Sequence, residues 1–365
     1  METTLAFKNI VYQLQRYPET KDNSLKAWSN AELLALNYLE DKNFSHYHIF
    51  NDRFGVWNCL LKNKPVKTIW TYASQRKAIE KNLQLNRIDV DDSSFIRPLE
   101  EYGTINCALV KIPKSLELFE LFLAKINKTS EENTEVVCCF MTKYFSTSYL
   151  KIAENYFSDI QQTKAWKKAR LLILKNPKKE LINEKKFINQ VSWKGDVLDQ
   201  YYGVFSSKSI DIGTQFLLEN LEVRKDEVKV LDVASGNGII ARELLKLNEN
   251  CELTLVDDFN LAIASSKFNL PEEKSTFICD NNLLTLKKNN FDLAVSNPPF
   301  HFEYENNIEI SLNLFSQIKD CLKNRGRFVL VANKHLNYKV HLKKLFTEVT
   351  VVNSNKKFEI ISCSK

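Results

Sequence analysis

Glycine is scarce in this sequence and unevenly distributed. The 365 residues include eight glycines, and only Gly55 and Gly103 lie before residue 190. Glycine allows the backbone to approach a ligand closely and to adopt conformations that other residues avoid. A glycine-dependent binding site is therefore expected only in the second half of the chain.

The sequence also lacks the patterns of metal sites, disulfide frameworks and membrane spans. Its eight cysteines are scattered without a CxxC pair, and its five histidines form no cluster beside them. Buried reduced thiols and no metal site are expected. No apolar run is long enough to cross a bilayer, and the start METTL lacks the basic and apolar stretches of a secretion signal. A cytoplasmic protein without a membrane partner is expected.

Positive charge exceeds negative charge modestly, with 51 Lys and Arg against 45 Asp and Glu. The segment 164–186 has nine basic residues and two acidic ones, which more than accounts for this excess. This segment is either a solvated linker or a strip that contacts RNA phosphates. Residues 175–194 are polar and contain Pro177, so we place a domain boundary there and expect domains at 1–185 and 186–365.

The second half alternates short apolar runs with helical patterns, which predicts an α/β fold with a mainly parallel sheet covered on both faces. The predicted helices are 239–247, 261–268 and 308–322. Seven strands are predicted at 228–233, 253–256, 277–279, 293–296, 328–331, 349–352 and 358–361. The last two are separated by a turn at 353–355 and form an antiparallel hairpin at the sheet edge. This arrangement is that of class I methyltransferases.

The first half has a similar rhythm without the chemistry. Strands are predicted at 47–50, 66–71 and 108–112, and the segment 51–55 (NDRFG) stands where a glycine loop would be. We interpret this half as a degenerate duplicate that kept the Rossmann-type sheet and lost cofactor binding.

The segment 232–238 (DVASGNG) lies between a predicted strand and a predicted helix. Gly236 and Gly238 let the backbone approach a ligand, and the helix N-terminus offers unpaired N–H groups. Asp257 closes the next strand, where a carboxylate accepts hydrogen bonds from ribose hydroxyls. Residues 236–241 also satisfy the GxGxxA dinucleotide fingerprint, so a nicotinamide cofactor is a rival.

Acidic residues separate these two cofactors. Asp232 ends the first strand, where it would repel a pyrophosphate but attract the sulfonium and ammonium of S-adenosylmethionine. Asp280 ends the third strand and is expected to face the adenine. Each acid alone can be a helix cap. Three acids at successive strand ends favour S-adenosylmethionine.

The fourth strand is followed by Asn297, Pro298, Pro299, Phe300 and His301. The lone pair of an exocyclic amino group is delocalised into its ring, so the group is a poor nucleophile. The side-chain carbonyl of Asn297 and the backbone carbonyl of Pro298 can accept its two hydrogens and turn the lone pair toward a methyl donor. Pro299 restricts Pro298 to an extended conformation, and Phe300 offers a flat face to a flipped base. No strong base is needed, and His301 is given no proton-transfer role.

NPPF followed by His301 resembles the ribosomal RNA guanine-N2 methyltransferases, which pair a degenerate N-terminal domain with an active C-terminal one. Further segments resemble the group that acts on the large subunit rather than its small-subunit sister group. They are 256–258, 264–267, 331–338, 51–55, 111–114 and 165–170.

The resemblance implies a monomeric S-adenosylmethionine-dependent enzyme that modifies a guanine of large-subunit ribosomal RNA, with the N-terminal domain and the basic segment presenting the RNA. It implies that 204–206 and 211–213 wall the cofactor pocket. The implied cofactor-binding residues are Phe205, Asp232, Ala234, Gly236, Gly238, Asp257, Asp280 and Asn297, and the implied base-binding residues are Asn297, Pro298, Pro299 and Phe300. The family has glycine at the position of Ala234, which puts the cofactor affinity in doubt.

Other functions are compatible with parts of the pattern. The alternatives are methylation of small-subunit ribosomal RNA, and an RNA-binding assembly factor whose catalysis is weakened by Ala234. Methylation of a protein glutamine or of adenine in DNA also uses NPP[YF]-type loops. The basic segment 164–186 favours RNA over peptide.

Overall fold

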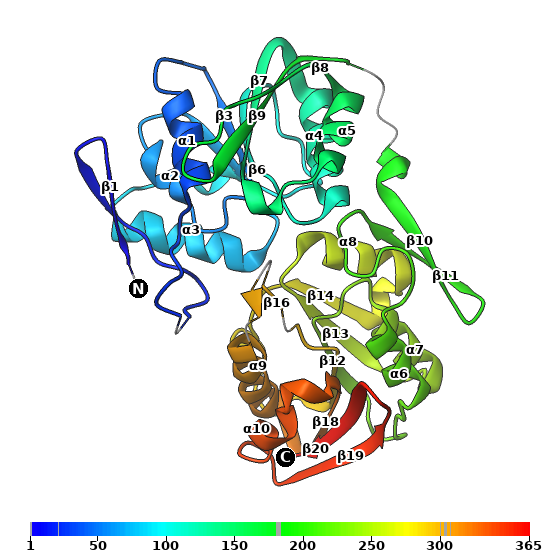
Figure 1. Ribbon diagram of the computed structural model, residues 1–365. Coiled ribbons are helices and arrows are strands. Elements are labelled where there is room, and N and C mark those ends of the chain that lie inside the picture. Colours follow the sequence, from blue (N-terminus) through cyan, green and yellow to red (C-terminus); the bar gives the residue numbers. More distant parts are fainter. Residues whose placement is uncertain (1, 21, 180–183, 300, 303–304, 307) are drawn as a thin grey trace. The chain divides into compact units, whose positions relative to one another are not determined.

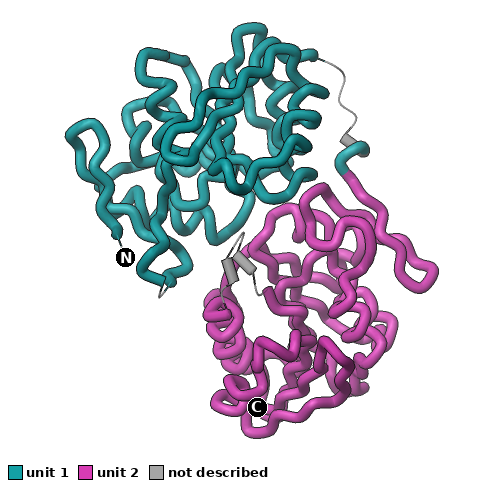
Figure 2. Tube along the Cα trace, in the orientation of Figure 1, with its two compact units in different colours: residues 1–187 teal, residues 188–365 magenta. Residues whose placement is uncertain are grey.

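The computed structural model describes residues 2–20, 22–179, 184–299, 301–302, 305–306 and 308–365. The chain divides into two compact units, Met1–Phe187 and Ile188–Lys365 (Figure 2). Each unit contains a mixed seven-stranded sheet with helices packed on it (Figure 1). This confirms the predicted fold class of two Rossmann-type α/β domains.

The first unit opens with a two-stranded ribbon and continues into its sheet. Its strands are β1 (Thr4–Phe7), β2 (Ile10–Gln13), β3 (Tyr47–Phe50), β4 (Val66–Ile69), β5 (Phe95–Ile96), β6 (Ile105–Lys111), β7 (Ser130–Met141), β8 (Phe157–Gln162) and β9 (Ala169–Pro177). Its helices are α1 (Asn30–Tyr38), α2 (Val56–Leu60), α3 (Ala73–Leu85), α4 (Leu116–Thr129) and α5 (Thr147–Tyr156).

The second unit has the same plan. Its strands are β10 (Ile188–Trp193), β11 (Asp196–Tyr201), β12 (Lys229–Val233), β13 (Glu252–Asp257), β14 (Ser275–Cys279), β15 (Phe291–Ser296), β16 (His301–Phe302), β17 (Glu305–Asn306), β18 (Leu322–Asn333), β19 (Glu348–Ser354) and β20 (Phe358–Ser364). Its helices are α6 (Ile212–Glu219), α7 (Ile239–Leu247), α8 (Asn260–Asn269), α9 (Ile308–Cys321) and α10 (Tyr338–Leu342). The predicted terminal hairpin is β19–β20, which pairs antiparallel.

Alternating side chains of the second sheet enter two different cores. Val230, Leu293 and Val295 pack with residues of α6 and α7 on one face, whereas Leu231 and Ala294 pack with α9 and α10 on the other. Successive side chains of a strand point to opposite faces, and both faces are covered here. The central strands β12 and β15 therefore read as near-continuous apolar runs, as in buried parallel sheets.

The two sheets have the same strand order. The first is β5-β4-β3-β6-β7-β9-β8, the second is β14-β13-β12-β15-β18-β20-β19, and each unit begins with a two-stranded ribbon. Every strand of the first unit has a counterpart in the second at the same place in the chain order. The duplicated sheet predicted for the first half is thus present in full.

The basic segment 164–186 is divided by a strand. Residues 169–177 form β9, which lies between β7 and β8 in the sheet, so the linker interpretation is wrong for them. Lys164, Lys167 and Lys168 are exposed in the turn before β9. Beyond its other end, the side chains of Lys178 and Lys179 donate to backbone carbonyls. The segment is therefore not one continuous strip.

Candidate active site

The glycine loop joins β12 to α7, and three of its residues have a left-handed backbone. Ala234, Gly236 and Gly238 all have left-handed φ values, of 59°, 57° and 83°. The Ala234 amide donates to the carbonyl of Val256 at 2.9 Å, which ties the loop to β13. The backbone of Ala234 is therefore held in a left-handed conformation, which costs an L-residue about 1–2 kcal/mol.

The two glycines of this loop serve different purposes. A Cβ atom at Gly238 would lie 3.0 Å from Leu270 Cδ1 and 3.3 Å from Ser266, so this glycine allows close packing of the loop. A Cβ atom at Gly236 would have no atom of the described residues within 4 Å. The backbone at Gly236 therefore borders open space, where a ligand can approach it.

Asp232 is buried beneath the loop and has one unsatisfied oxygen. Asp232 is only 1% exposed, and its Oδ2 accepts a hydrogen bond from the Ala241 amide in α7 at 3.2 Å. Among the described residues, its Oδ1 has no hydrogen-bond partner, and neither has the buried hydroxyl of Ser235. Burial raises the pKa of Asp232 to about 7, although the Ala241 hydrogen bond opposes this. A buried acceptor without a donor fits a cationic ligand group such as an ammonium.

The other two predicted acids lie at the adjacent strand ends. Asp257 accepts hydrogen bonds from the amides of Gly236 and Phe259, each at 2.9 Å, and burial raises its pKa to about 6. Asp280 follows β14 and accepts from the Asn282 amide at 3.0 Å. Asp257 thus shapes the glycine loop directly, while each of its oxygens retains a lone pair for a ribose hydroxyl.

The Asn297–Pro298–Pro299 segment begins next to the glycine loop. Val233 and Ser296 are paired in neighbouring parallel strands, and the Ser296 hydroxyl donates to the Val233 carbonyl at 2.7 Å. The Asn297 side-chain NH2 donates to Thr214 Oγ1 at 2.8 Å and to Asp211 Oδ2 at 3.3 Å.

The end of this segment is fixed as well. Ser311 of α9 donates to the Pro299 carbonyl, and the Tyr338 hydroxyl lies 3.0 Å from Ser311 Oγ. Pro298 is buried and Pro299 is exposed. The predicted base-stacking residue Phe300 lies outside the described residues.

A small hollow of about 60 Å³ lies beside this segment. Its lining includes Asp211, Asn297 and Pro298, together with residues 331–333, Tyr338 and Phe358. A hollow of this size holds about four water molecules.

Phe205, in the loop before α6, is 65% exposed. The structure therefore brings Asp232, Gly236, Gly238, Asp257 and Asn297 to one edge of the sheet and leaves Phe205 in solvent.

The sequence reasoning gave no role to three residues of this site, although one of them, Tyr338, ends the segment 331–338 that carries the resemblance. Thr214, Ser311 and Tyr338 hold the segment after β15, yet they belong to α6, α9 and α10. A local signal existed only for Asp211, which caps α6 by accepting from the Thr214 amide at 3.1 Å.

At the corresponding edge of the first unit's sheet, a buried side chain stands where the second unit has Gly236. Phe50 pairs with Val110 as Val233 pairs with Ser296, so Asn51 corresponds to Ala234 and Lys111 to Asn297. Asn51 and Gly55 are left-handed, like Ala234 and Gly238, but Arg53 stands where the second unit has Gly236. Arg53 is 3% exposed, with its guanidinium 4.4 Å from the ring centre of Tyr72.

Metal-ligand clusters and membrane-spanning helices are both missing from the described residues. No group of three or more His, Cys, Asp or Glu among them has an arrangement suited to a metal ion. Within the described part of the chain, no helix combines the length and apolar character that crossing a membrane requires. All eight cysteines are free, and seven of them are buried.

Comparison with known proteins assigns both halves of the chain. Residues 2–179 match the RLMG N-terminal domain, and residues 197–362 match the methyltransferase small domain. The 16S rRNA N2 G1207 methyltransferase (RsmC) of T. thermophilus, solved with AdoMet and guanosine, is similar over 100% of this chain and 97% of its own, with 17% identity and a TM-score of 0.77.

A SAM-dependent methyltransferase from Aquifex aeolicus is similar over 42% of this chain and 89% of its own, with 17% identity and a TM-score of 0.33. The range matched by the methyltransferase small domain includes the glycine loop, the three acids and Asn297. The chain belongs to the two-domain methyltransferases in which an RLMG N-terminal domain precedes a methyltransferase small domain, and its cofactor is S-adenosylmethionine.

Proposed function

We propose that this protein transfers a methyl group from S-adenosylmethionine to the N2 amino group of a guanine in large-subunit ribosomal RNA. The observation that carries the proposal is the side chain of Asn297, which lies beside the glycine loop with its NH2 group held by Thr214 and Asp211. Its carbonyl oxygen therefore remains available to accept a hydrogen bond from a substrate amino group.

The residues under the glycine loop suit the cofactor. Asp232 Oδ1 is a buried acceptor to which no described residue donates, and the backbone at Gly236 borders open space. Asp232 would hold the cationic methionine end, Asp257 the ribose, and Asp280 the adenine. When bound, S-adenosylmethionine supplies a methyl group on a positively charged sulfur, which is a strong electrophile.

The chain's own contribution to the reaction is positioning. Asn297 Oδ1 and the Pro298 carbonyl each accept one hydrogen of the target amine, which turns its lone pair out of conjugation and toward the methyl group. Phe300 would stack on the flipped base. The amine nitrogen gains the methyl group as the donor's sulfur–methyl bond breaks, and it then releases one proton to water. Since positioning and fixed dipoles supply the rate, no buried general base is required.

Large-subunit RNA is proposed because the resemblance of the sequence to that group spans both halves of the chain. The runner-up is a guanine of small-subunit RNA, which is the substrate named for the T. thermophilus relative. For the first unit we propose RNA recognition, since its closed edge has no room for a cofactor at Arg53 and carries exposed lysines.

The proposal is tested by transfer of labelled methyl groups to ribosomal RNA from cells that lack the protein. Wild-type protein should label large-subunit RNA as N2-methylguanine. Asn297→Ala should lower the rate on the order of 100-fold or more while S-adenosylmethionine binding persists. The matched control is Asn250→Ala, which changes an exposed asparagine in the turn before β13.

Other results would select other functions. Labelling of small-subunit RNA would support the runner-up. If the cofactor binds but no RNA or ribosomal subunit is labelled, a protein or DNA substrate becomes the better proposal. If the cofactor does not bind, an RNA-binding assembly factor is the better proposal.

A further inference from the structure

The amide group of Asn297 is held in one orientation by the start of α6. Asp211 is the N-cap of this helix and Thr214 is its third residue. The two hydrogens of the Asn297 NH2 group face Thr214 Oγ1 and Asp211 Oδ2. Both donors of the amide are therefore used inside the protein, whereas its acceptor has no hydrogen bond within the described part of the chain.

The chemistry of Asp211 excludes the flipped amide. A carboxylate can only accept hydrogen bonds, whereas a threonine hydroxyl can donate or accept. If the amide were rotated by 180°, Asn297 Oδ1 would face the Asp211 oxygen and two acceptors would repel each other. Asp211 itself is fixed because its Oδ2 also accepts from the Thr214 amide. The carboxylate thus determines which end of the amide points away from α6.

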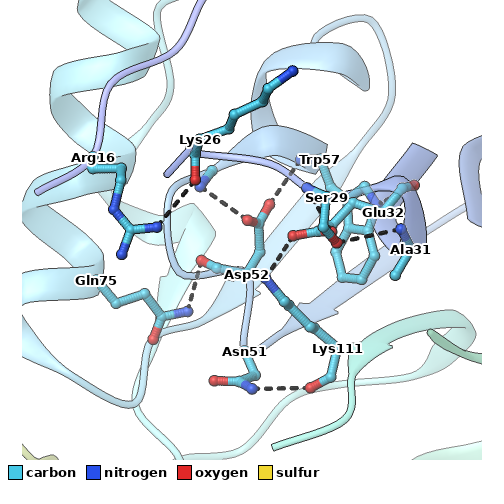
Figure 3. A network of polar contacts seen from close by, with 11 residues as sticks. Arg16, Lys26, Ser29, Ala31, Glu32, Asn51, Asp52, Trp57, Gln75 and Lys111 are labelled. Atoms are coloured by element: carbon cyan, nitrogen blue, oxygen red, sulfur yellow. Dashed lines mark hydrogen bonds and ion pairs between the residues drawn. The ribbon is translucent and has the colours of Figure 1, made fainter. Parts of the chain in front are cut away.

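The first unit contains the same contact made with different residues. Its helix α1 has Ser29 as N-cap and Glu32 as third residue, and Glu32 Oε1 lies 2.6 Å from Lys111 Nζ (Figure 3). Ser29, Glu32 and Lys111 correspond to Asp211, Thr214 and Asn297. The fold therefore links the start of this helix to the end of the fourth strand in both units. Only the second unit puts there a residue that can accept from an amine, because lysine is a donor alone.

We infer that Thr214 and Asp211 are positioning residues that orient the Asn297 amide so that its carbonyl oxygen faces the target amino group. This inference rests on the proposed function, because it assigns Asn297 to the amine. The two residues act through Asn297 and make no contact with the base themselves. Their loss should lower the rate of methyl transfer without weakening cofactor binding.

The central test compares Thr214→Val with Thr214→Ser. Valine keeps the shape of the side chain and removes its oxygen, so kcat should fall about tenfold, as for the loss of one hydrogen bond. Serine retains the hydroxyl and should restore kcat to within about threefold. The KM for RNA and the Kd of S-adenosylmethionine should change less than about twofold in both. Thr276→Val, at an exposed position of β14, is the matched control.

Asp211→Asn tests the orientation itself. Asparagine also caps helices well, so α6 should persist. Its amide can present either end to Asn297, so kcat should again fall about tenfold.

A binding measurement gives a readout that does not depend on turnover. Once the wild-type product has identified the methylated guanine, RNA fragments are prepared with that guanine or with inosine, which lacks the N2 amino group. Wild-type protein should prefer guanine, and Thr214→Val should lower this preference toward one.

Two results would overturn the inference while leaving the proposed function intact. One is a wild-type enzyme that methylates RNA together with unchanged kcat in Thr214→Val and Asp211→Asn. The other is a loss confined to KM or to cofactor affinity, which would make these residues part of a binding wall. A wild-type protein that methylates no guanine would overturn the proposed function and this inference together.

Discussion

At the scale of single residues, the second unit keeps two carboxyl groups in a poorly solvated place. Burial raises the pKa of Asp232 to about 7 and that of Asp257 to about 6, and the charge of Asp257 raises the pKa of Asp232 further. Each group keeps its proton to a higher pH in the folded chain than in the unfolded one. Their contribution to the free energy of unfolding is therefore complete below about pH 4 and is lost as the pH rises toward 7.

A bound cation reverses this preference, because it favours the ionised carboxylate. We expect S-adenosylmethionine to bind roughly tenfold more tightly at pH 8 than at pH 5.5, with proton release on binding near pH 6 to 7. Calorimetry in buffers of different ionisation enthalpy measures both quantities. Asp232→Asn should bind more weakly and with a flatter pH profile, whereas the exposed Asp226→Asn should behave as wild type. An unchanged profile in Asp232→Asn would contradict this assignment.

At the scale of elements, the two β–loop–α units preserve one backbone and fill it differently. The loops 51–55 and 234–238 both begin and end with a left-handed residue. In the first unit, the Lys111–Glu32 pair closes the end of β6, and Glu32 is fully buried while the Lys111 side chain is 24% exposed. The second unit closes the same place with neutral Asn297 and Thr214.

Breaking the ion pair should destabilise the first unit more than replacing it. Glu32→Gln removes the fully buried carboxylate of this ion pair, so the free energy of unfolding should fall by about 2–4 kcal/mol. The double change Glu32→Thr with Lys111→Asn introduces the neutral Thr–Asn pair that the second unit has at this place. It should recover at least half of the lost free energy of unfolding. Urea unfolding followed by tryptophan fluorescence reports on this unit, since Trp28, Trp57, Trp70 and Trp166 lie in it and only Trp193 lies beyond it.

Glu132→Gln, at an exposed position of β7, is the control and should leave stability within about 0.5 kcal/mol of wild type. Cofactor affinity should not change in any of these variants. A Glu32→Gln protein as stable as wild type would show that the pair is not needed for this fold.

The sequence predicted the second sheet well because its central strands are buried on both faces and read as apolar runs. The predicted bounds of α7, 239–247, agree with the structure. In the first unit the predicted bounds of β3, 47–50, also agree, but two other strands were harder to predict. Strand β7 opens with the polar residues 130–135, and β9 lies inside the basic segment, where charge obscured the apolar run 171–174.

The candidate site was predictable where its chemistry follows strand ends, as for Asp232, Asp257 and Asn297. The contacts of Asn297 were not, because Thr214 lies 83 residues away and no local pattern links the two. The cap at Asp211 leaves a sequence signal, but the second use of its carboxylate depends on how α6 packs against the end of β15.

At the scale of the whole molecule, one edge of the first unit's sheet carries five exposed lysines. Exposed Lys114 and Lys143 follow β6 and β7, which are parallel neighbours. Strand β9 runs antiparallel to β7 and pairs its first residue, Ala169, with Met141, the last residue of β7. The turn that holds Lys164, Lys167 and Lys168 therefore lies at the same edge. Lys178 and Lys179 lie beyond the other end of β9, roughly 26 Å away along the strand.

This distribution predicts where RNA phosphates bind. Changing Lys164, Lys167 and Lys168 together to glutamine should weaken RNA binding about tenfold or more at moderate salt. The slope of log K against log salt should fall in magnitude by about 2–3, because each lysine that neutralises a phosphate releases roughly one counterion. Titrations of labelled ribosomal RNA fragments at several salt concentrations measure both effects. Cofactor affinity should be unaffected.

The matched control changes three exposed lysines at the opposite edge of the same sheet, Lys62, Lys64 and Lys128, to glutamine. Both triple variants lose the same net charge, so a purely long-range attraction would weaken RNA binding equally in the two. A loss confined to the first variant supports a phosphate-binding edge at the β8–β9 turn. Equal losses would contradict it, because they would mean that net charge and not the position of the lysines governs affinity.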